Sequence, residues 1–189
     1  MGMPAAARRW TAAEVRAMQD DSRPAPRFEL IDGELIVTPS PRGAHQLAVG
    51  ELLRKLADYV ESEEIGVAVT SPADIELEEE SVVQPDVFVV PAACAGPPLE
   101  WTNVHTLLLA VEVLSPSNER QDRMIKRRFF QRVGVPEYWI VDIDARQIER
   151  WRPGDARAEV VRSRLEWHPA GARTTLTLDL VAFFQRILG

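Results

Sequence analysis

The hydrophobic residues of this chain recur with a helical period in some stretches and alternate or run together in others, which separates predicted helices from predicted strands. The helical period is clearest from Gly43 to Ser62, where one stripe is apolar: Val49, Leu52, Leu53, Leu56, Tyr59 and Val60. This pattern predicts a core-facing helix of about five turns. A second predicted helix, from Glu119 to Val133, is rich in arginine and ends before Gly134.

Two shorter helices are predicted near the ends of the chain. Thr11 and Glu14 have the spacing of a capping box, which begins a helix that ends before Pro24. Asp179 is placed to cap a last helix from Leu180 to Leu188.

Strands are predicted where apolar residues alternate or form short runs. Arg27 to Val37 is typical of a hairpin, because Asp32-Gly33 favours a tight turn between two apolar segments. The other predicted strands are 65–70, 73–77, 82–90, 107–115, 137–142 and 147–151, with peripheral strands near 158–167 and 174–178. This order predicts an α/β fold, in which a central mixed β-sheet is flanked by helices and β-hairpins are added at the N- and C-terminal ends.

Two carboxylates interrupt these apolar runs. Glu112 lies in a run typical of a strand covered on both faces, where an unpaired charge costs several kcal/mol. Asp86 lies in the run 82–90, beside Pro85, which cannot donate to a strand ladder and so indicates a strand start, a bend or an edge. Two acids on core strands beside a basic helix make a candidate site for a hard metal ion. In the alternative interpretation, Glu112 pairs with an arginine of that helix and Asp86 accepts backbone amides.

Composition narrows the class of protein. The 46% hydrophobic and 27% charged content is ordinary for a folded chain of 189 residues, and we expect residues 1–189 to form one domain. A net charge of −7 argues against a protein that coats nucleic acid nonspecifically. The basic helix still offers a local surface, on which Arg120, Arg123 and Arg127 are the candidate nucleic-acid contacts; the same arginines can also form a solvated face.

Cysteine content and hydropathy bear on location. Cys94 is the only cysteine, which excludes an intramolecular disulfide and a cysteine-based zinc cluster and favours a reducing, cytoplasmic setting. No apolar run approaches the roughly 18 residues that a membrane span needs, so we expect no membrane association.

Six short motifs occur in a fixed order along the chain. They are 28–35, Ser40-Pro41-Arg42 with His45, 82–86, 111–117, Asp122 with Lys126, and 134–142. Each is weak alone, but the ordered set is specific. It resembles the PD-(D/E)XK nuclease superfamily and, within it, the Uma-type family of predicted restriction endonucleases. The resemblance covers about residues 27–145 and implies a restriction-endonuclease-like core over that range.

The resemblance makes Pro85-Asp86 the "PD" pair and Glu112 the acid of "(D/E)XK". The sequence departs from the superfamily pattern at Leu114, where the lysine is expected, and the Uma-type family is similar in this respect, with Lys126 on the next helix supplying the cation. Lys126 is one of only two lysines, which suggests a need for a compact point charge. A second departure is Phe130, where the family usually has an aromatic hydroxyl.

These residues define an expected chemistry. Asp86 and Glu112 are the expected catalytic acids and ligands of Mg²⁺ or Mn²⁺, and Lys126 assists by offsetting charge on the transition state. Asp122, one turn before Lys126, is expected to hold that lysine, and His45 to contact a phosphate or to cap the turn. Further ligands or orienting residues are expected among Glu34, His45, Asp74, Gln84 and Asp122.

Three functional hypotheses follow. The first is a metal-dependent endonuclease that hydrolyses phosphodiester bonds in DNA, acting as a homodimer because one active site reaches only one strand. The second is a binding protein that keeps the fold and the basic helix but does not cut. The third is an interaction module that uses the loop from Pro91 to Trp101. The presence of two buried acids, Asp86 and Glu112, together with Lys126 favours the endonuclease hypothesis. A protein that does not cut has no need of all three residues.

Overall fold

The computed structural model describes residues 8–21, 26–38 and 42–189. The predicted helix end before Pro24 and the Ser40-Pro41 pair lie outside this range. The centre of the fold is a six-stranded sheet in the order β3-β4-β5-β6-β7-β8. Its strands are β3 (Gly66–Thr70), β4 (Val87–Pro91), β5 (Leu109–Val113), β6 (Tyr138–Asp142), β7 (Gln147–Trp151) and β8 (Glu159–Val161).

One pair of neighbours in this sheet is parallel. β5 and β6 run in the same direction, whereas the other neighbouring strands described in this sheet are antiparallel. The connection between β5 and β6 passes through a helix, as a parallel pair requires. The carboxyl ends of β5 and β6 therefore open at the same edge of the sheet, a common position for a binding site. The predicted mixed sheet is confirmed.

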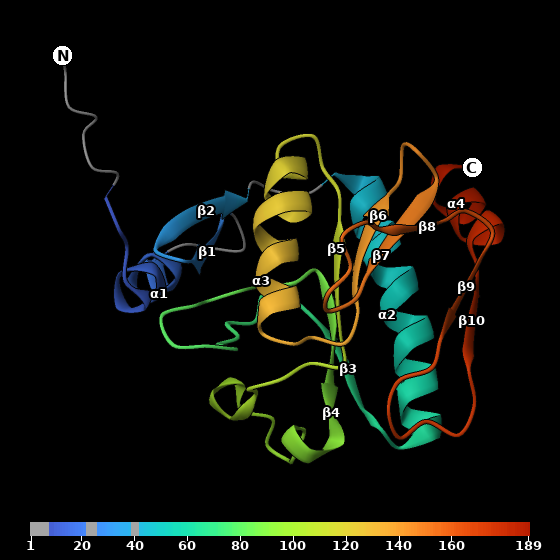
Figure 1. Ribbon diagram of the computed structural model, residues 1–189, viewed down its shortest axis with the longest axis horizontal. Helices are drawn as coiled ribbons and strands as arrows, with labels where there is room; N and C mark the ends of the chain where they lie inside the picture. The colour runs from blue at the N-terminus through green and yellow to red at the C-terminus, as the bar shows by residue number, and fades with distance from the viewer. Residues whose placement is uncertain (1–7, 22–25, 39–41) are drawn as a thin grey trace.

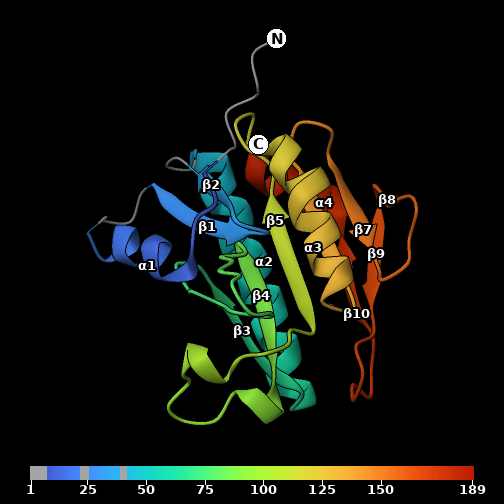
Figure 2. The ribbon, with the colours of Figure 1, turned by 60° about the vertical axis from the view of Figure 1, so that its left-hand side comes forward.

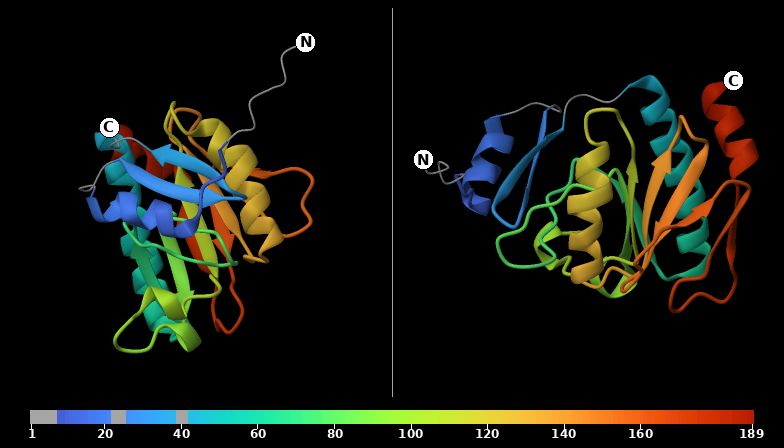
Figure 3. Two further views of the ribbon diagram at one scale, coloured as in Figure 1. Left: turned by 90° about the vertical axis from the view of Figure 1, so that its left-hand side faces the viewer. Right: turned by 45° about the horizontal axis from the view of Figure 1, so that its top comes forward.

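Helices cover both faces of the sheet (Figure 2). One face packs against α2 (Gly43–Glu63) and α4 (Leu180–Leu188), and the two helices lie side by side (Figure 3). The other face packs against α3 (Arg127–Arg132), whose Phe129 and Phe130 are fully buried. No helix in the described part of the chain combines the length and the apolar character needed to cross a bilayer.

Strand β5 is buried along its whole length, as its apolar run predicted. Because side chains alternate along a strand, Val111 and Val113 face the α2 side, while Ala110 faces the α3 side. Glu112 has the same parity as Ala110 and points toward the basic helix.

The N-terminal elements form a separate layer at the left of Figure 1. α1 (Ala12–Asp21) begins with the predicted capping box: Thr11 N donates to Glu14 Oε2 at 2.9 Å, and Glu14 N donates to Thr11 Oγ1 at 3.3 Å. It packs against the hairpin of β1 (Arg27–Ile31) and β2 (Glu34–Thr38). Both turn residues have a positive φ, 53° at Asp32 and 78° at Gly33, as an Asp-Gly hairpin turn requires.

The C-terminal elements also follow the sequence prediction. β9 (Arg164–Trp167) and β10 (Leu176–Asp179) form an antiparallel pair outside the main sheet. Asp179 Oδ1 accepts a hydrogen bond from Ala182 N at 3.0 Å, so it caps α4 as predicted.

Three local predictions were wrong in extent. The segment 73–77 is not a full strand, because it forms a single bridge, between Ile75 and Val83. The run 82–90 becomes β4 only from Val87, since Pro85 and a bend at Asp86 come before it. The loop after β4 contains two short 3₁₀ turns, η1 (Ala92–Cys94) and η2 (Trp101–Asn103).

The basic helix is also less regular than predicted. Its segment η3 (Gln121–Lys126) is a π-helix that runs directly into α3. Such wide turns occur frequently at functional sites, and this one carries Asp122 and Lys126.

Candidate active site

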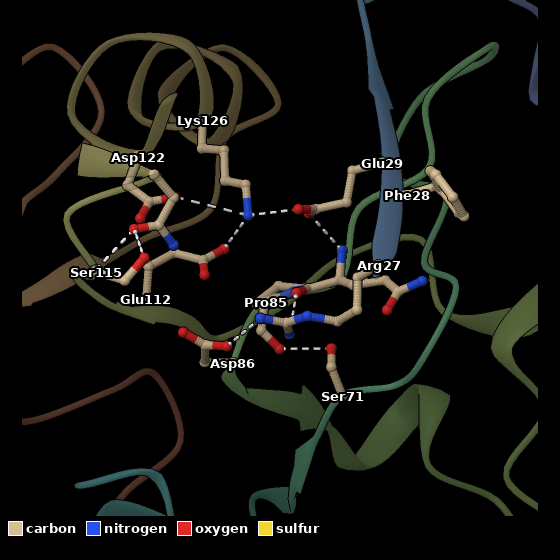
Figure 4. A network of polar contacts seen from close by, with 12 residues as sticks. Arg27, Phe28, Glu29, Ser71, Pro85, Asp86, Glu112, Ser115, Asp122 and Lys126 are labelled. Atoms are coloured by element: carbon tan, nitrogen blue, oxygen red, sulfur yellow. Dashed lines mark hydrogen bonds and ion pairs between the residues drawn. The ribbon is translucent and has the colours of Figure 1, made fainter. Parts of the chain in front are cut away.

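Four carboxylates and two cations are buried together where the N-terminal hairpin, β5 and η3 meet (Figure 4). The relative exposure is 0% for Glu29, Glu112 and Asp122, 3% for Asp86 and 1% for Lys126. The sixth member is Arg27, whose side chain is 14% exposed. Charges so far from water are tolerated only when they are paired or neutralised.

Lys126 is shared by three of these acids. Its Nζ lies 2.7 Å from Glu29 Oε2, 2.9 Å from Glu112 Oε1 and 3.7 Å from Asp122 Oδ1. Burial alone would lower the pKa of Lys126, but the carboxylates around it, Glu112 first, raise that pKa above its ordinary value. The side chain is therefore a permanent ammonium ion. Glu112 pairs with this lysine and with no arginine of the described residues, contrary to the alternative interpretation.

Asp86 has partners on both of its oxygens. Arg27 Nη2 donates to Oδ1 at 2.7 Å, while Oδ2 accepts Val113 N at 2.9 Å and lies 3.0 Å from His45 Nε2. Burial would raise the pKa of Asp86, but the hydrogen bond from His45 and the charge of Arg27 hold it well below its usual range. Asp86 is therefore an ionised carboxylate held in one orientation.

Glu112 and Asp122 are much less well compensated. Glu112 Oε2 and both carboxylate oxygens of Asp122 are buried, and none of the three has a hydrogen-bond partner within the described part of the chain. Burial raises the pKa of Glu112 well above its usual value, and Lys126 offsets this only in part. Burial likewise raises the pKa of Asp122 to about 7. One ammonium ion is not enough for the three acids around it.

The π-turn is held by a tyrosine from the neighbouring strand. The Asp122 carbonyl accepts the amide of Arg127, five residues on, and also the Tyr138 hydroxyl at 3.1 Å. Phe130 packs against Tyr138, with 4.9 Å between the ring centroids, and is fully buried. A hydroxyl at position 130 would therefore point into the core layer.

Most of the predicted site residues meet here. Asp86, Glu112, Lys126, His45 and Asp122 belong to one network, and the backbone amide of Gln84 joins it by donating to Glu29 Oε1 at 2.8 Å. The Gln84 side chain instead donates to Asp74 Oδ1 at 2.8 Å, so these two residues form a separate pair beside the network. The roles of Asp74 and Gln84 as ligands or orienting residues stay predictions.

Glu34 lies apart from the network. It is exposed at the start of β2 and lines a surface groove with Arg120, Arg128 and Arg132. Its predicted role as a supporting ligand stays a prediction.

The three candidate nucleic-acid contacts have different surroundings. Arg120 is exposed and reaches the groove beside Glu34. Arg123 is bound internally to Glu119, Asp142 and Glu149. Arg127 lies over the Trp151 ring, 4.6 Å from its centroid. Arg120 is the only one of the three for which no intramolecular side-chain partner is described.

The sequence prediction missed Arg27 and Glu29 as site residues. Both project from β1 toward the acids, because residues two apart on a strand share a face. The sequence does contain a signal for these two residues, because the charged Arg27 and Glu29 alternate with the apolar Phe28 and Leu30. That these charges would face β5 and η3 depends on the docking of the hairpin, through the two hydrogen bonds between Leu30 and Val82.

The donor set can be tested for a divalent metal ion. Four buried carboxylates against one arginine and one lysine leave a formal charge of −2, which a divalent cation would neutralise. Carboxylate oxygens are the ligands that Mg²⁺ and Mn²⁺ prefer, and Glu112 Oε2 accepts no hydrogen bond from any residue that the structure describes. Among the described residues, however, no group of three His, Cys, Asp or Glu side chains is gathered tightly enough to hold an ion. The donor chemistry and the formal charge fit such an ion, and Asp86 and Glu112 are the residues that would hold it.

Comparisons with known proteins show the fold and the family of this chain. A crystal structure titled as a putative nuclease belonging to DUF820 from Anabaena variabilis ATCC 29413 is 21% identical to this chain, with a TM-score of 0.73. The match covers 92% of this chain and 98% of that one, which shows a shared fold. No curated protein matches. The model of the family Uma2, described as "Putative restriction endonuclease", matches residues 12–183. The chain therefore belongs to the Uma2 family and has its nuclease-like α/β fold.

Proposed function

We propose that this protein is an endonuclease that hydrolyses phosphodiester bonds in DNA with the help of Mg²⁺ or Mn²⁺. The observation that carries the proposal is the buried excess of negative charge around Glu112 and Asp122, in a chain of the Uma2 family. A purely structural cluster of ion pairs would gain stability from full compensation, whereas this one, with Glu112 and Asp122 both ionised, lacks the equivalent of one divalent cation.

Asp86 and Glu112 would hold the metal ion. When bound, the ion supplies Lewis-acid activation of the phosphodiester and of water. The protein contributes an ionised Asp86, whose orientation is fixed by Arg27, His45 and the amide of Val113. Such preorganisation avoids the free-energy cost of ordering the ligand when the ion binds.

Lys126 would act as a charge and a hydrogen-bond donor. Because its pKa is raised, it does not serve as a general base at neutral pH. It is suited to stabilise the negative charge that develops on phosphoryl oxygens in the transition state. Glu29, 2.7 Å from Nζ on the side of the hairpin, acts as the positioning residue for this ammonium.

DNA is the proposed substrate because a basic surface lies close to the site. Arg120, Arg128 and Arg132 line one groove between the hairpin and the basic helix. Arg132 is already paired with Asp32 and Glu78, but Arg120 and Arg128 have no ion-pair partner in the described structure and are exposed. Exposed arginines of this kind suit phosphate contacts. Two copies of the protein would be needed to cut both strands, so we propose a homodimer.

One observation favours the second candidate function, a nucleic-acid-binding protein that does not cut. Both oxygens of Asp86 are engaged by protein donors, and Arg27 occupies the oxygen that faces away from His45. Unless Arg27 shares or releases that carboxylate, Asp86 has little capacity left for a metal ion. The two candidates therefore differ in whether divalent ions bind.

Cleavage of supercoiled plasmid separates the two candidates. We expect the wild-type protein to nick the plasmid with Mn²⁺ or Mg²⁺ and to be inactive with EDTA. Glu112→Gln should lose at least about a hundredfold in rate, since a metal ligand is removed. Glu61→Gln is the matched control, because Glu61 is an exposed acid on α2. Wild-type protein that leaves single-stranded, duplex and branched DNA intact would favour the second candidate.

Thermal stability tests metal binding without a substrate. An ion that binds only the folded state raises Tm with concentration, and about 100 Kd of ion stabilises by about 2.7 kcal/mol. We expect Mn²⁺ or Mg²⁺ to raise Tm of the wild type and of Glu61→Gln but not of Glu112→Gln. An equal rise in all three proteins would show binding elsewhere and contradict the assigned ligands.

A further inference from the structure

A cavity of about 370 Å³ lies beside the buried acids, at the carboxyl ends of the parallel strands. Leu114 and Ser115 follow β5 into its wall, Asp142 ends β6 there, and Arg42 and His45 come from the start of α2. Its volume falls within the roughly 300–1,000 Å³ typical of small-molecule sites. The metal-binding proposal makes no use of this space.

One wall of the cavity is suited to an anion. α2 is 21 residues long, has no acidic residue in its first turn, and its N-cap residue Arg42 makes no side-chain cap. The free amides and the helix dipole therefore favour negative charge at this end. Arg42 is exposed, and its guanidinium has no ion-pair partner in the part of the chain that the structure describes.

His45 gives independent evidence of a missing ligand. It is 6% exposed, it lines the cavity, and its Nε2 is held by Asp86 at 3.0 Å. Its Nδ1 is buried, and no hydrogen-bond partner for it occurs among residues 8–21, 26–38 and 42–189. Buried polar atoms are nearly always satisfied in native proteins, so this nitrogen indicates a group that the protein alone does not supply. The same imidazole links the cavity to the proposed metal ligand.

The opposite wall is acidic and suits hydrogen-bond donors rather than an anion. Glu119 and Asp142 are both paired with Arg123, at 2.8 Å for Asp142, but this arginine also pairs with Glu149, so one guanidinium is shared by three carboxylates. Asp144 is exposed at the rim. Between the two walls, Leu114, Pro116 and Ile143 provide apolar surface.

We propose that this cavity binds one nucleotide of the nucleic-acid strand, next to the bond that is cut. The phosphate lies at the start of α2 against Arg42, the sugar and base pack on Leu114, Pro116 and Ile143, and polar groups of the base face Asp142 and Asp144. A nucleotide matches this pocket because it is anionic at the end that would meet Arg42, apolar on its faces, and carries at least one hydrogen-bond donor on its base for the acidic wall. The assignment rests on the proposed function for its choice of substrate.

Amide NMR titration in EDTA tests the assignment without metal or cleavage. Thymidine 5′-monophosphate should shift resonances of residues 42–45, 114–116 and 142–145, and a short oligodeoxythymidylate should shift the same set. Arg42→Ala should weaken binding of the monophosphate about tenfold, the loss of one charge-assisted contact, but leave thymidine unaffected. Arg157→Ala is the matched control, since Arg157 is also exposed and lies outside the cavity.

A second variant blocks the cavity without touching the acids. Ala145 is exposed at the rim, so Ala145→Trp should fold normally, fill the space and abolish the nucleotide shifts. The proposal is overturned if about 10 mM monophosphate shifts none of these residues, a concentration that reaches Kd values in the millimolar range. It is also overturned if Ala145→Trp binds the nucleotide as the wild type does, or if the monophosphate binds but the oligonucleotide does not.

The outcomes for the two proposals are distinct. Nucleotide binding that is lost in Ala145→Trp, in a protein that never cuts DNA, would support the pocket and reject the nuclease. Metal-dependent cleavage that is unchanged in Ala145→Trp would support the nuclease and reject the pocket.

Discussion

The two acids at the centre of the site, Asp86 and Glu112, are buried to almost the same degree but behave in opposite ways. Asp86 is held by an arginine, a histidine and a backbone amide, and its pKa is lowered. Glu112 shares one ammonium with Glu29 and Asp122, and its pKa is raised. Burial alone therefore does not distinguish the two acids. The ratio of cations to carboxylates around each acid does, and it marks Glu112 as the place that lacks positive charge.

Removal of the shared cation, Lys126, should lower the free energy of unfolding more than any other change considered. Lys126→Met leaves three buried carboxylates without their ammonium, and breaking such a pair from one side costs about 3–5 kcal/mol. We expect urea denaturation at pH 7.5 to show a loss of this size, with partial recovery near pH 5, where the acids are protonated. The other lysine gives the control: Lys55→Met on α2 removes a half-buried partner of Glu51 and should cost under about 1 kcal/mol. Equal losses in both variants would contradict the shared role of Lys126.

Neutralisation of Asp86 should cost less but still be clearly destabilising. Asp86→Asn keeps the shape but replaces one acceptor oxygen by a donor, so either Arg27 or the pair of His45 and Val113 loses its partner. Loss of a buried charged hydrogen bond costs about 2–3 kcal/mol. The exposed Asp58 on α2 provides the control, and Asp58→Asn should be close to neutral in the same urea titration. A stabilised Asp86→Asn would show that its partners do not compensate the charge.

The pH dependence of the free energy of unfolding should show that Asp122, one of the acids that share Lys126, is poorly compensated. The pKa of Asp122 is about 7 in the folded protein against 3.8 ordinarily, so the folded state binds the proton more tightly. Stability therefore falls as pH rises between about 4 and 7. Asp86 has the opposite sign: its contribution is full above its ordinary pKa and is lost only in strong acid.

The measurement is Tm between pH 5 and 8 in EDTA. We expect Tm of the wild type to fall over this range by the equivalent of about 2 kcal/mol in the free energy of unfolding. Tm of Asp122→Asn should fall distinctly less. A wild-type Tm that does not change, or that rises with pH, would contradict the poor compensation of this acid.

The smallest effect, and the sharpest contrast with Asp86, is expected for Glu112→Gln in the absence of metal. Glutamine is close in shape to a protonated glutamate and keeps an oxygen for Lys126, while the cluster becomes less negative. We expect a stability change under about 1 kcal/mol, neutral or favourable, in urea titrations with EDTA. A loss as large as that of Asp86→Asn would mean that Glu112 is well compensated after all.

Local sequence signals gave most of the fold. The Asp32-Gly33 turn, the stripe on α2 and the cap at Asp179 each act within a few residues, and each was predicted correctly. The segment 73–77 shows the limit of such signals, because an alternating pattern becomes a strand only where a partner strand is available.

The site was predictable to the extent that charge in an apolar run is conspicuous. Asp86, Glu112 and Lys126 do meet in one buried network, whereas their role in catalysis stays a prediction. Arg27 and Glu29 were missed because their meeting with the acids depends on tertiary docking of the hairpin. The π-turn was missed because an i to i+5 pattern leaves no clear period in a sequence.

The contribution of the β1–β2 hairpin means that the main sheet and the buried charge cluster begin at different points along the chain. A chain that started after residue 42 would retain every strand of the main sheet and the helices on both of its faces. It would lack the guanidinium opposite Asp86 and the carboxylate behind Lys126, and water would enter where those groups now pack. Such a shortened protein would keep the architecture of the sheet but not the closed set of charges that the hairpin completes.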